Sequence, residues 1–131
     1  MESAEKATRN KNTVLLVDDE EMVLDIGVQM LSRLGYSVIQ AESGTEAIGI
    51  FQKDSETIDI VILDIVMPDL DGGETVAAIR EINPDVKIVL SSGFGRDGKT
   101  NEILERCNGF IQKPFSMKEL SETLSRVVQQ N

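Results

Sequence analysis

Five short apolar runs rich in β-branched residues alternate with amphipathic stretches along this chain of 131 residues. The runs cover residues 13–17, 36–41, 58–63, 86–91 and 109–112. Several are apolar at successive positions, which is typical of strands that are buried on both faces of a parallel sheet. Strands that alternate with helices in this way predict an α/β fold. We expect one domain over residues 13–129, because that length allows a full hydrophobic core.

The spacing of apolar residues between the strands predicts five amphipathic helices. In the first helix, one apolar face recurs with helical spacing and is expected to cover the core, with Val23, Ile26, Met30 and Leu34 as its members. Gly35 follows where a left-handed C-terminal cap is expected. Two capping boxes predict where other helices begin, namely Ser43 with Glu46 and Ser116 with Glu119.

Four polar residues stand directly after apolar runs. Asp18 and Asp19 follow the first run, Asp64 follows the third, and Lys113 follows the fifth. The carboxyl ends of parallel strands meet at one edge of the sheet, which is where ligands bind in open α/β sheets. Carboxylates about 4 Å apart repel by roughly 4 kcal/mol per pair at an effective dielectric constant near 20. The cluster therefore predicts a compensating divalent metal ion together with the lysine.

Four sequence pieces around these residues occur in the order found in one family. They are Leu-Val-Asp18-Asp19, Ile-Leu-Asp64-Ile-Val-Met-Pro-Asp-Leu-Asp-Gly, Leu-Ser-Ser92-Gly and Gln-Lys113-Pro-Phe. Together they resemble the CheY-like receiver domain of bacterial two-component response regulators and hybrid sensor kinases. The resemblance implies a flavodoxin-like (βα)5 fold, with a five-stranded parallel sheet of order 2-1-3-4-5 and helices on both faces.

The same resemblance implies a site for phosphoryl transfer. Asp64 would be the phosphoacceptor, and Mg²⁺ or Mn²⁺ would bind Asp19 and Asp64 directly. Asp18 would bind the metal directly or through water, and the backbone carbonyl of Val66 would be the third protein ligand. Lys113 would meet a phosphoryl oxygen as a compact positive charge. Mg²⁺ suits such a site because it prefers oxygen ligands.

The conformational switch is expected to involve a hydroxyl and an aromatic ring. Ser91 and Ser92 are both candidates for the hydroxyl that contacts the phosphoryl group, and alignment with the family favours Ser92. Phe110 takes the place of the family's switching aromatic residue, although it lacks the hydroxyl of tyrosine and could equally belong to the core. The family also suggests that the Lys113–Pro114 peptide bond is cis.

These features predict a phosphoaspartate signalling switch that is not a turnover enzyme. A histidine kinase or a histidine phosphotransfer protein would be the donor, and a downstream protein would bind near the helix over residues 98–107, the fifth strand and the last helix. The net charge of −10 argues against nucleic-acid binding. The single cysteine and the lack of a long apolar run argue against secretion and membrane insertion and favour the cytoplasm.

The bounds of the functional protein are a separate expectation. Residues 1–12 lack an apolar stretch and are interpreted as a disordered leader or an expression remnant, and residues 130–131 as a tail. The chain would be either a stand-alone regulator or a receiver taken from a larger protein such as a hybrid kinase. The sequence leaves open whether it forms a homodimer.

Three other interpretations compete with this one. Residues 93–100, Gly-Phe-Gly-Arg-Asp-Gly-Lys-Thr, match a phosphate-binding loop and suggest a nucleotide-binding protein, but the loop follows the fourth strand and comes after Asp64. A pseudo-receiver that has lost phosphorylation is disfavoured, because all the required side chains are present. Finally, Asp19 could simply cap a helix starting at Glu20, and Lys113 could be an ordinary surface lysine.

Overall fold

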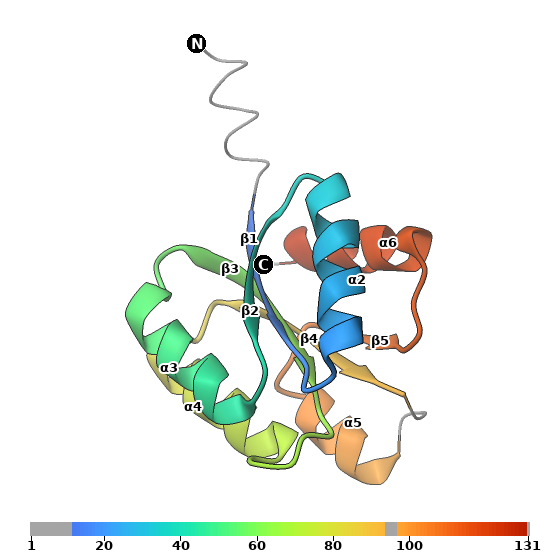
Figure 1. Ribbon diagram of the computed structural model, residues 1–131. Helices are drawn as coiled ribbons and strands as arrows, with labels where there is room; N and C mark the ends of the chain where they lie inside the picture. Colours follow the sequence, from blue (N-terminus) through green and yellow to red (C-terminus); the bar gives the residue numbers. More distant parts are fainter. Residues whose placement is uncertain (1–11, 94–96, 131) are drawn as a thin grey trace.

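The computed structural model describes residues 12–93 and 97–130, which form one parallel sheet covered by helices on both faces (Figure 1). In chain order the elements are β1 (Thr13–Val17), α2 (Glu21–Arg33), β2 (Ser37–Ala41), α3 (Gly44–Asp54), β3 (Ile58–Asp64), α4 (Gly72–Ile82), β4 (Lys87–Ser92), α5 (Gly98–Leu104), β5 (Gly109–Gln112) and α6 (Met117–Val128). The strand order is β2-β1-β3-β4-β5. The predicted fold class is therefore confirmed, while the leader predicted over residues 1–12 lies almost wholly outside the described residues.

All five predicted strands are present, and three of them have shifted ends. Strand β2 begins one residue later than predicted, because the Tyr36 N–H donates to the Leu31 carbonyl at the end of α2. Strand β3 extends one residue further, to Asp64, which pairs with Ser91 of β4. Strand β4 begins one residue later than predicted and extends to Ser92, which pairs with Gln112 of β5. The predicted helix over 98–107 is shorter in the structure and ends at Leu104.

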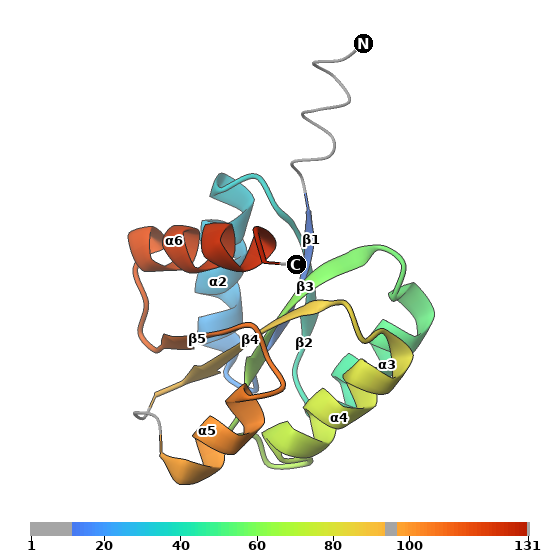
Figure 2. The same cartoon turned by 180° about the vertical axis from the view of Figure 1, so that it is seen from behind.

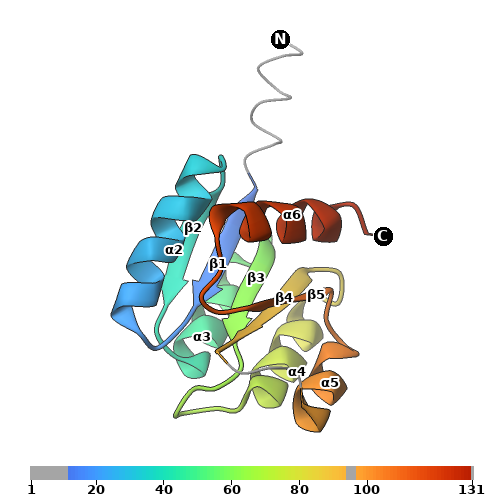
Figure 3. The same cartoon turned by 90° about the vertical axis from the view of Figure 1, so that its right-hand side faces the viewer.

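Helices cover both faces of the sheet (Figures 2 and 3), and the buried core forms one layer on each face. One layer packs between the sheet and α3, α4 and α5, and the other between the sheet and α2 and α6. Neighbouring strand residues alternate between the layers, so that Leu63 belongs to the first and Ile62 to the second. Fully burying each such side chain contributes about 1.5–3 kcal/mol. Both sheet faces are covered, and polar side chains gather at the strand ends.

Helix α2 is rotated relative to the prediction. The residues buried beneath it are Leu24, Gly27 and Leu31. Met30 and Leu34 are half-buried and pack against this core layer, whereas Val23 is only half-buried and Ile26 is 47% exposed, so the predicted core face is wrong in its first turn. The reason is the close approach of the helix to β1 at Gly27, where an added Cβ would lie 2.6 Å from Leu16 Cδ2. The helix therefore has apolar side chains at Val23 and Ile26 that are not buried in the core.

The helix ends follow the predicted capping only in part. Ser116 and Glu119 form a complete capping box at the start of α6, as predicted. At the start of α3, Ser43 Oγ accepts from the Glu46 N–H at 3.0 Å, but the Glu46 carboxylate accepts from the Glu42 N–H. That second box is therefore only half formed, because the glutamate reaches one residue further back along the chain.

Two backbone positions confirm expectations from the sequence. Gly35 has φ of +98°, and its N–H donates to the Ser32 carbonyl, which closes α2 with a left-handed residue. The Lys113–Pro114 peptide bond is cis. Within the described part of the chain, none of the helices combines the length and the apolar character needed to cross a membrane.

Candidate functional site

Three carboxylates meet at the carboxyl edge of the sheet. Asp18 and Asp19 follow β1 and Asp64 ends β3, and one oxygen from each lies within 4.8 Å of one from each of the others. Asp18 and Asp64 are 1% and 4% exposed, whereas Asp19 is exposed to solvent. The central strands β1 and β3 are paired, so their ends bring these residues together. The carboxylates of Asp18 and Asp64 are thus buried, and that of Asp19 lies beside them at the surface.

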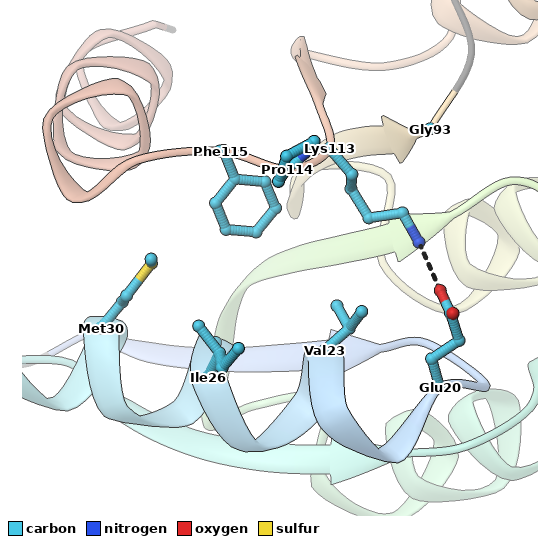
Figure 4. Close-up of a pocket in the computed structure, with 9 residues that line it drawn as sticks. Glu20, Val23, Ile26, Met30, Gly93, Lys113, Pro114 and Phe115 are labelled. Atoms are coloured by element: carbon cyan, nitrogen blue, oxygen red, sulfur yellow. Dashed lines mark ion pairs between the residues drawn. The ribbon is translucent and has the colours of Figure 1, made fainter.

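Lys113 provides the positive charge at this edge. Its Nζ lies 2.9 Å from Asp18 Oδ2 and 3.1 Å from Asp64 Oδ2, and its side chain is 13% exposed. A third carboxylate oxygen, Glu20 Oε1, lies 3.6 Å away on a largely exposed side chain (Figure 4). The Lys113 N–H donates to the Ser92 carbonyl, which fixes the lysine backbone beside β4. Lys113 is therefore an integral part of the cluster rather than a surface lysine.

The second oxygen of each buried aspartate accepts a backbone hydrogen bond. The Glu20 N–H donates to Asp18 Oδ1 at 2.9 Å, and the Val66 N–H donates to Asp64 Oδ1 at 3.0 Å. Each donor lies two residues after its acceptor, which is a turn typical of aspartate. With Lys113 on the other oxygen, each carboxylate is held in one orientation.

Burial and charge shift the ionisation of these groups. Burial raises the pKa of the Asp64 carboxyl above its ordinary value of 3.8, and the negative charge of Asp18 adds to the rise, while hydrogen bonds from Val66 and Lys113 partly oppose it. Burial alone would lower the pKa of Lys113, but hydrogen bonds to Asp18 and Asp64 outweigh it and leave this pKa raised. The lysine is therefore firmly charged, and the cluster as a whole carries excess negative charge.

Asp19 does not cap a helix. The N-cap of α2 is Glu20, and its side chain makes no capping bond. The Asp19 carboxylate is instead exposed beside the two buried ones. Three carboxylates at this spacing are hard oxygen ligands, which fits a small divalent cation such as Mg²⁺.

The remaining candidate residues surround the cluster. Ser91 and Ser92 are buried at the end of β4, where Ser91 is paired in register with Asp64. Val66 is 57% exposed beside Asp64. Phe110 is half-buried on β5 and packs against the core layer beneath α3, α4 and α5. The roles expected for Ser92, Val66 and Phe110 stay predictions.

An apolar groove of about 400 Å³ leads away from the cluster along α2 (Figure 4). On one side, α2 contributes Val23, Ile26 and Met30, of which Met30 also packs against the core. Phe115 lines the opposite side, and Lys113 and Glu20 line the end nearest the cluster. The groove was not expected from the sequence, because Val23, Ile26 and Met30 were all predicted to face the core.

The contacts of two other acidic residues were also not predicted from the sequence. Glu20 approaches Lys113, as described above, and only its place in the acidic run after β1 could have suggested this. Asp69 lies in the loop between β3 and α4 and accepts from the Gly44 and Thr45 N–H groups at the start of α3. No local sequence pattern indicates these two hydrogen bonds, because Gly44 and Thr45 lie 25 and 24 residues before Asp69 in the chain.

A parallel sheet of this order, with buried carboxylates and a lysine at its carboxyl edge, defines a class of α/β signalling domain. The family model for the response regulator receiver domain matches residues 14–125. The chain belongs to the response regulator receiver domain family. Members of this family are phosphoaspartate signalling switches, not classical turnover enzymes, and this chain is such a switch.

Similar proteins contain this domain in longer chains. The sensor kinase CckA of Brucella abortus (strain 2308) is 38% identical over 128 residues, which cover 95% of this chain and 14% of that protein. The probable transcriptional regulator ycf27 of Guillardia theta is 37% identical over 125 residues, covering 90% of this chain and 46% of that protein. This chain therefore spans less than half the length of either relative.

A solved structure supports the same conclusion. The CheX–CheY–BeF3–Mg²⁺ complex from Borrelia burgdorferi contains a chain with a TM-score of 0.85 and 27% identity, covering 91% of this chain and 90% of that one. The family match also spans residues 93–100, so the nucleotide-binding interpretation is not favoured. Residues 94–96 of that segment lie outside the described residues.

Proposed function

We propose that Asp64 is the phosphoacceptor of this receiver domain. The observation that carries the proposal is the position of its Oδ2, which lies 3.1 Å from Lys113 Nζ in a buried cluster with Asp18. A nucleophilic carboxylate needs charge neutralisation where negative charge gathers during phosphoryl transfer. Lys113 is already within bonding distance of the oxygen that we expect to react. Its charge is thus available without any large movement.

The reaction is a phosphoryl transfer between two protein groups. An oxygen of Asp64 attacks phosphorus, an acyl phosphate P–O bond forms, and the P–N bond to a donor histidine breaks. The imidazole nitrogen leaves with the electron pair of the broken bond. With acetyl phosphate as a small donor, the bond that breaks is P–O and acetate leaves. Lys113 would exchange its bond to Asp64 for one to the incoming phosphoryl oxygen.

The acidic cluster is expected to hold Mg²⁺, or Mn²⁺ in its place. Asp19 and Asp64 would be direct ligands, Asp18 a direct or water-mediated one, and the Val66 carbonyl the third protein ligand. When bound, the cation would neutralise charge on the phosphoryl group and on the carboxylates. The protein residues supply the oxygen donors, and the Val66 N–H and Lys113 keep Asp64 oriented.

The conformational output is expected near α5, β5 and α6. A new phosphoryl group beside β4 would draw in the Ser92 hydroxyl, and Phe110 on β5 would follow into the space behind it. Phe110 already packs against the core layer beneath α5, so its movement would change the packing under that helix. Such a change is a shift in population between two conformations, read by a downstream protein.

Acetyl phosphate and a chelator test the metal-dependent reaction. In the presence of Mg²⁺, the protein is expected to gain the mass of one phosphate, and the modification should be labile in base. Removing Mg²⁺ with EDTA should abolish this gain, because uncompensated carboxylates would repel the donor. Mass spectrometry of the intact protein measures both results. Labelling that is equally fast in EDTA would contradict the metal site.

The groove along α2 is the surface on which we expect a protein donor to dock. It begins at Lys113 and Glu20, so a helix lying in it would present a phosphohistidine to Asp64. Ile26→Lys should slow transfer from a phosphorylated histidine phosphotransfer protein roughly tenfold, which corresponds to about 1.4 kcal/mol. Labelling by acetyl phosphate should be unchanged, because the small donor needs no groove.

Val128→Lys is a matched control for that experiment. Val128 is an exposed apolar residue, as Ile26 is, with 41% against 47% exposure, but it lies at the end of α6 outside the groove. Transfer to this variant should proceed at the wild-type rate, as followed by loss of label from the donor. Equal slowing by both substitutions would argue that charge alone, rather than the groove, affects docking.

The larger protein remains a separate proposal. The relatives include a sensor kinase and a probable transcriptional regulator, each longer than this chain. We propose that this receiver acts in a phosphorelay, either as a stand-alone regulator or within a hybrid kinase. A cytoplasmic location and the domain bounds at residues 13 and 129 also stay predictions.

A further inference from the structure

Asp69 ties the loop between β3 and α4 to a helix that lies outside the site. Its Oδ1 accepts from the Gly44 N–H at 3.1 Å, and its Oδ2 accepts from the Thr45 N–H at 2.9 Å. Both donors belong to the first turn of α3, where backbone N–H groups lack partners within the helix. The second half of the loop over residues 65–71 is therefore anchored to the start of α3.

The tie is a charged one. Hydrogen bonds from the Thr45 side chain and N–H, together with the Gly44 N–H, lower the pKa of Asp69 to about 2. The carboxylate is therefore ionised at neutral pH, where the positive end of the α3 dipole favours it. A neutral residue of similar shape would retain part of the geometry but lose this charge-assisted bonding.

Both ends of the loop also pack closely against their surroundings. An added Cβ at Gly44 would lie 3.0 Å from Leu70 Cβ, so the end of the loop rests directly on the start of α3. At its beginning, the Ile65 N–H donates to the Ser91 carbonyl, and an added Cβ at Gly72 would lie 2.9 Å from Ile65 Cγ2. Val66 lies between these two contacts, directly after Ile65, whose N–H is bonded to Ser91 of β4.

We propose that Asp69 is a positioning residue for the metal site, which holds the loop so that the Val66 carbonyl is in place before the cation binds. The inference rests on the proposed function, because it concerns the ligand expected from Val66. Asp69 itself touches neither the phosphoryl group nor the cation. Its effect is to lower the population of conformations in which residues 65–71 have moved away from Asp64. Partners that orient a metal ligand typically affect metal affinity 10- to 100-fold.

The test compares two residues that both cap α3. Asp69→Ala removes the capping bonds and the tie to the loop, whereas Ser43→Ala removes only a capping bond, the one from the Glu46 N–H to Ser43 Oγ. Both substitutions should lower the melting temperature by a similar few degrees. Only Asp69→Ala should raise the Mg²⁺ dissociation constant, by roughly tenfold, in calorimetric titrations of the unphosphorylated protein.

Two further measurements separate positioning from a general loss of structure. Phosphorylation by acetyl phosphate should need about tenfold more Mg²⁺ in Asp69→Ala, yet reach nearly the wild-type rate at saturating Mg²⁺. Without metal, hydrogen exchange at the amides of residues 65–71 should be faster in this variant and unchanged in Ser43→Ala. Asp69→Asn, which keeps one acceptor oxygen but loses the second and the charge, should have an Mg²⁺ affinity between those of the wild type and Asp69→Ala, and wild-type affinity in this variant would contradict the charged tie.

The outcomes distinguish the positioning role of Asp69 from the proposed function on which it rests. Wild-type Mg²⁺ affinity in Asp69→Ala would overturn the positioning role alone. Equal weakening of Mg²⁺ binding in Asp69→Ala and Ser43→Ala would also overturn it, because fraying of α3 would then be the cause. If the wild type itself bound no Mg²⁺, the metal site and the positioning role would both fall.

Discussion

Asp64→Asn is expected to abolish labelling by acetyl phosphate and to stabilise the protein in the absence of metal. The amide cannot form the acyl phosphate, so intact-protein mass spectrometry should detect no added phosphate. The substitution also removes one negative charge from a buried cluster in which, among the described residues, Lys113 is the cation shared by the two buried aspartates. Loss of function and gain of stability should therefore appear in the same variant.

The gain in stability should depend on pH in a defined direction. Because burial raises the pKa of Asp64 in the folded protein, ionisation of this group favours the unfolded chain. That cost is absent below the unfolded value of about 3.8 and is complete once the pH exceeds the raised folded value. The melting temperature of Asp64→Asn should thus exceed that of the wild type at pH 7, and the difference should disappear below about pH 4.

Asp59→Asn serves as the control for this substitution. Asp59 lies on the same strand but is exposed, and its carboxylate accepts from the Thr13 N–H away from the site. This variant should be labelled as fast as the wild type. Undiminished labelling of Asp64→Asn would mean that another residue accepts the phosphoryl group, and a lower melting temperature for it at pH 7 would contradict the electrostatic argument.

The sheet and most of the cluster could be predicted because their signals are local. Each strand contains a short apolar run, and a polar residue at the carboxyl end of a strand must lie at the edge of the sheet. The convergence of Asp18 with Asp64 and Lys113 follows from the sheet order, which the family resemblance supplied. Once the strand order is known, Lys113 is expected to lie beside Asp64 and Asp18, which are 49 and 95 residues away from it in the chain.

The rest depended on contacts that no local pattern encodes. Helix α2 is apolar over more than one face, and the tight contact of Gly27 with Leu16 decides which of these faces covers the core. The groove at Ile26 and the tie made by Asp69 arise only after elements distant in sequence have packed together. These features concern docking and positioning, whereas the reacting groups themselves are marked by strand ends.

Lys113→Met should destabilise the metal-free protein by about 3 kcal/mol at neutral pH. Among the described residues, Lys113 is the cation whose ammonium bonds to both Asp18 and Asp64, and methionine leaves these buried carboxylates without a positive partner. For a domain of this size, the loss corresponds to a fall of roughly 10 °C in melting temperature, measured by circular dichroism. Labelling by acetyl phosphate should also become at least about tenfold slower, since the phosphoryl oxygen loses its cation.

Mg²⁺ and a second substitution identify the cause of that destabilisation. The pKa of Lys113 is raised in the folded protein, so its stabilising effect is complete below the unfolded value of 10.5 and is lost only as the pH rises through the folded value. The deficit of Lys113→Met should therefore be the same at pH 7 and pH 8. Saturating Mg²⁺ should restore part of it, because a cation that binds only the folded state stabilises that state.

Adding Asp64→Asn to Lys113→Met should restore much of the stability without metal, since one of the two unpaired charges is then gone. If Lys113→Met melted at the wild-type temperature, or if the double variant were as unstable as the single one, the ion pairs at this edge would contribute little to folding. In the second case, the cost would have to come from the lost packing of the lysine side chain.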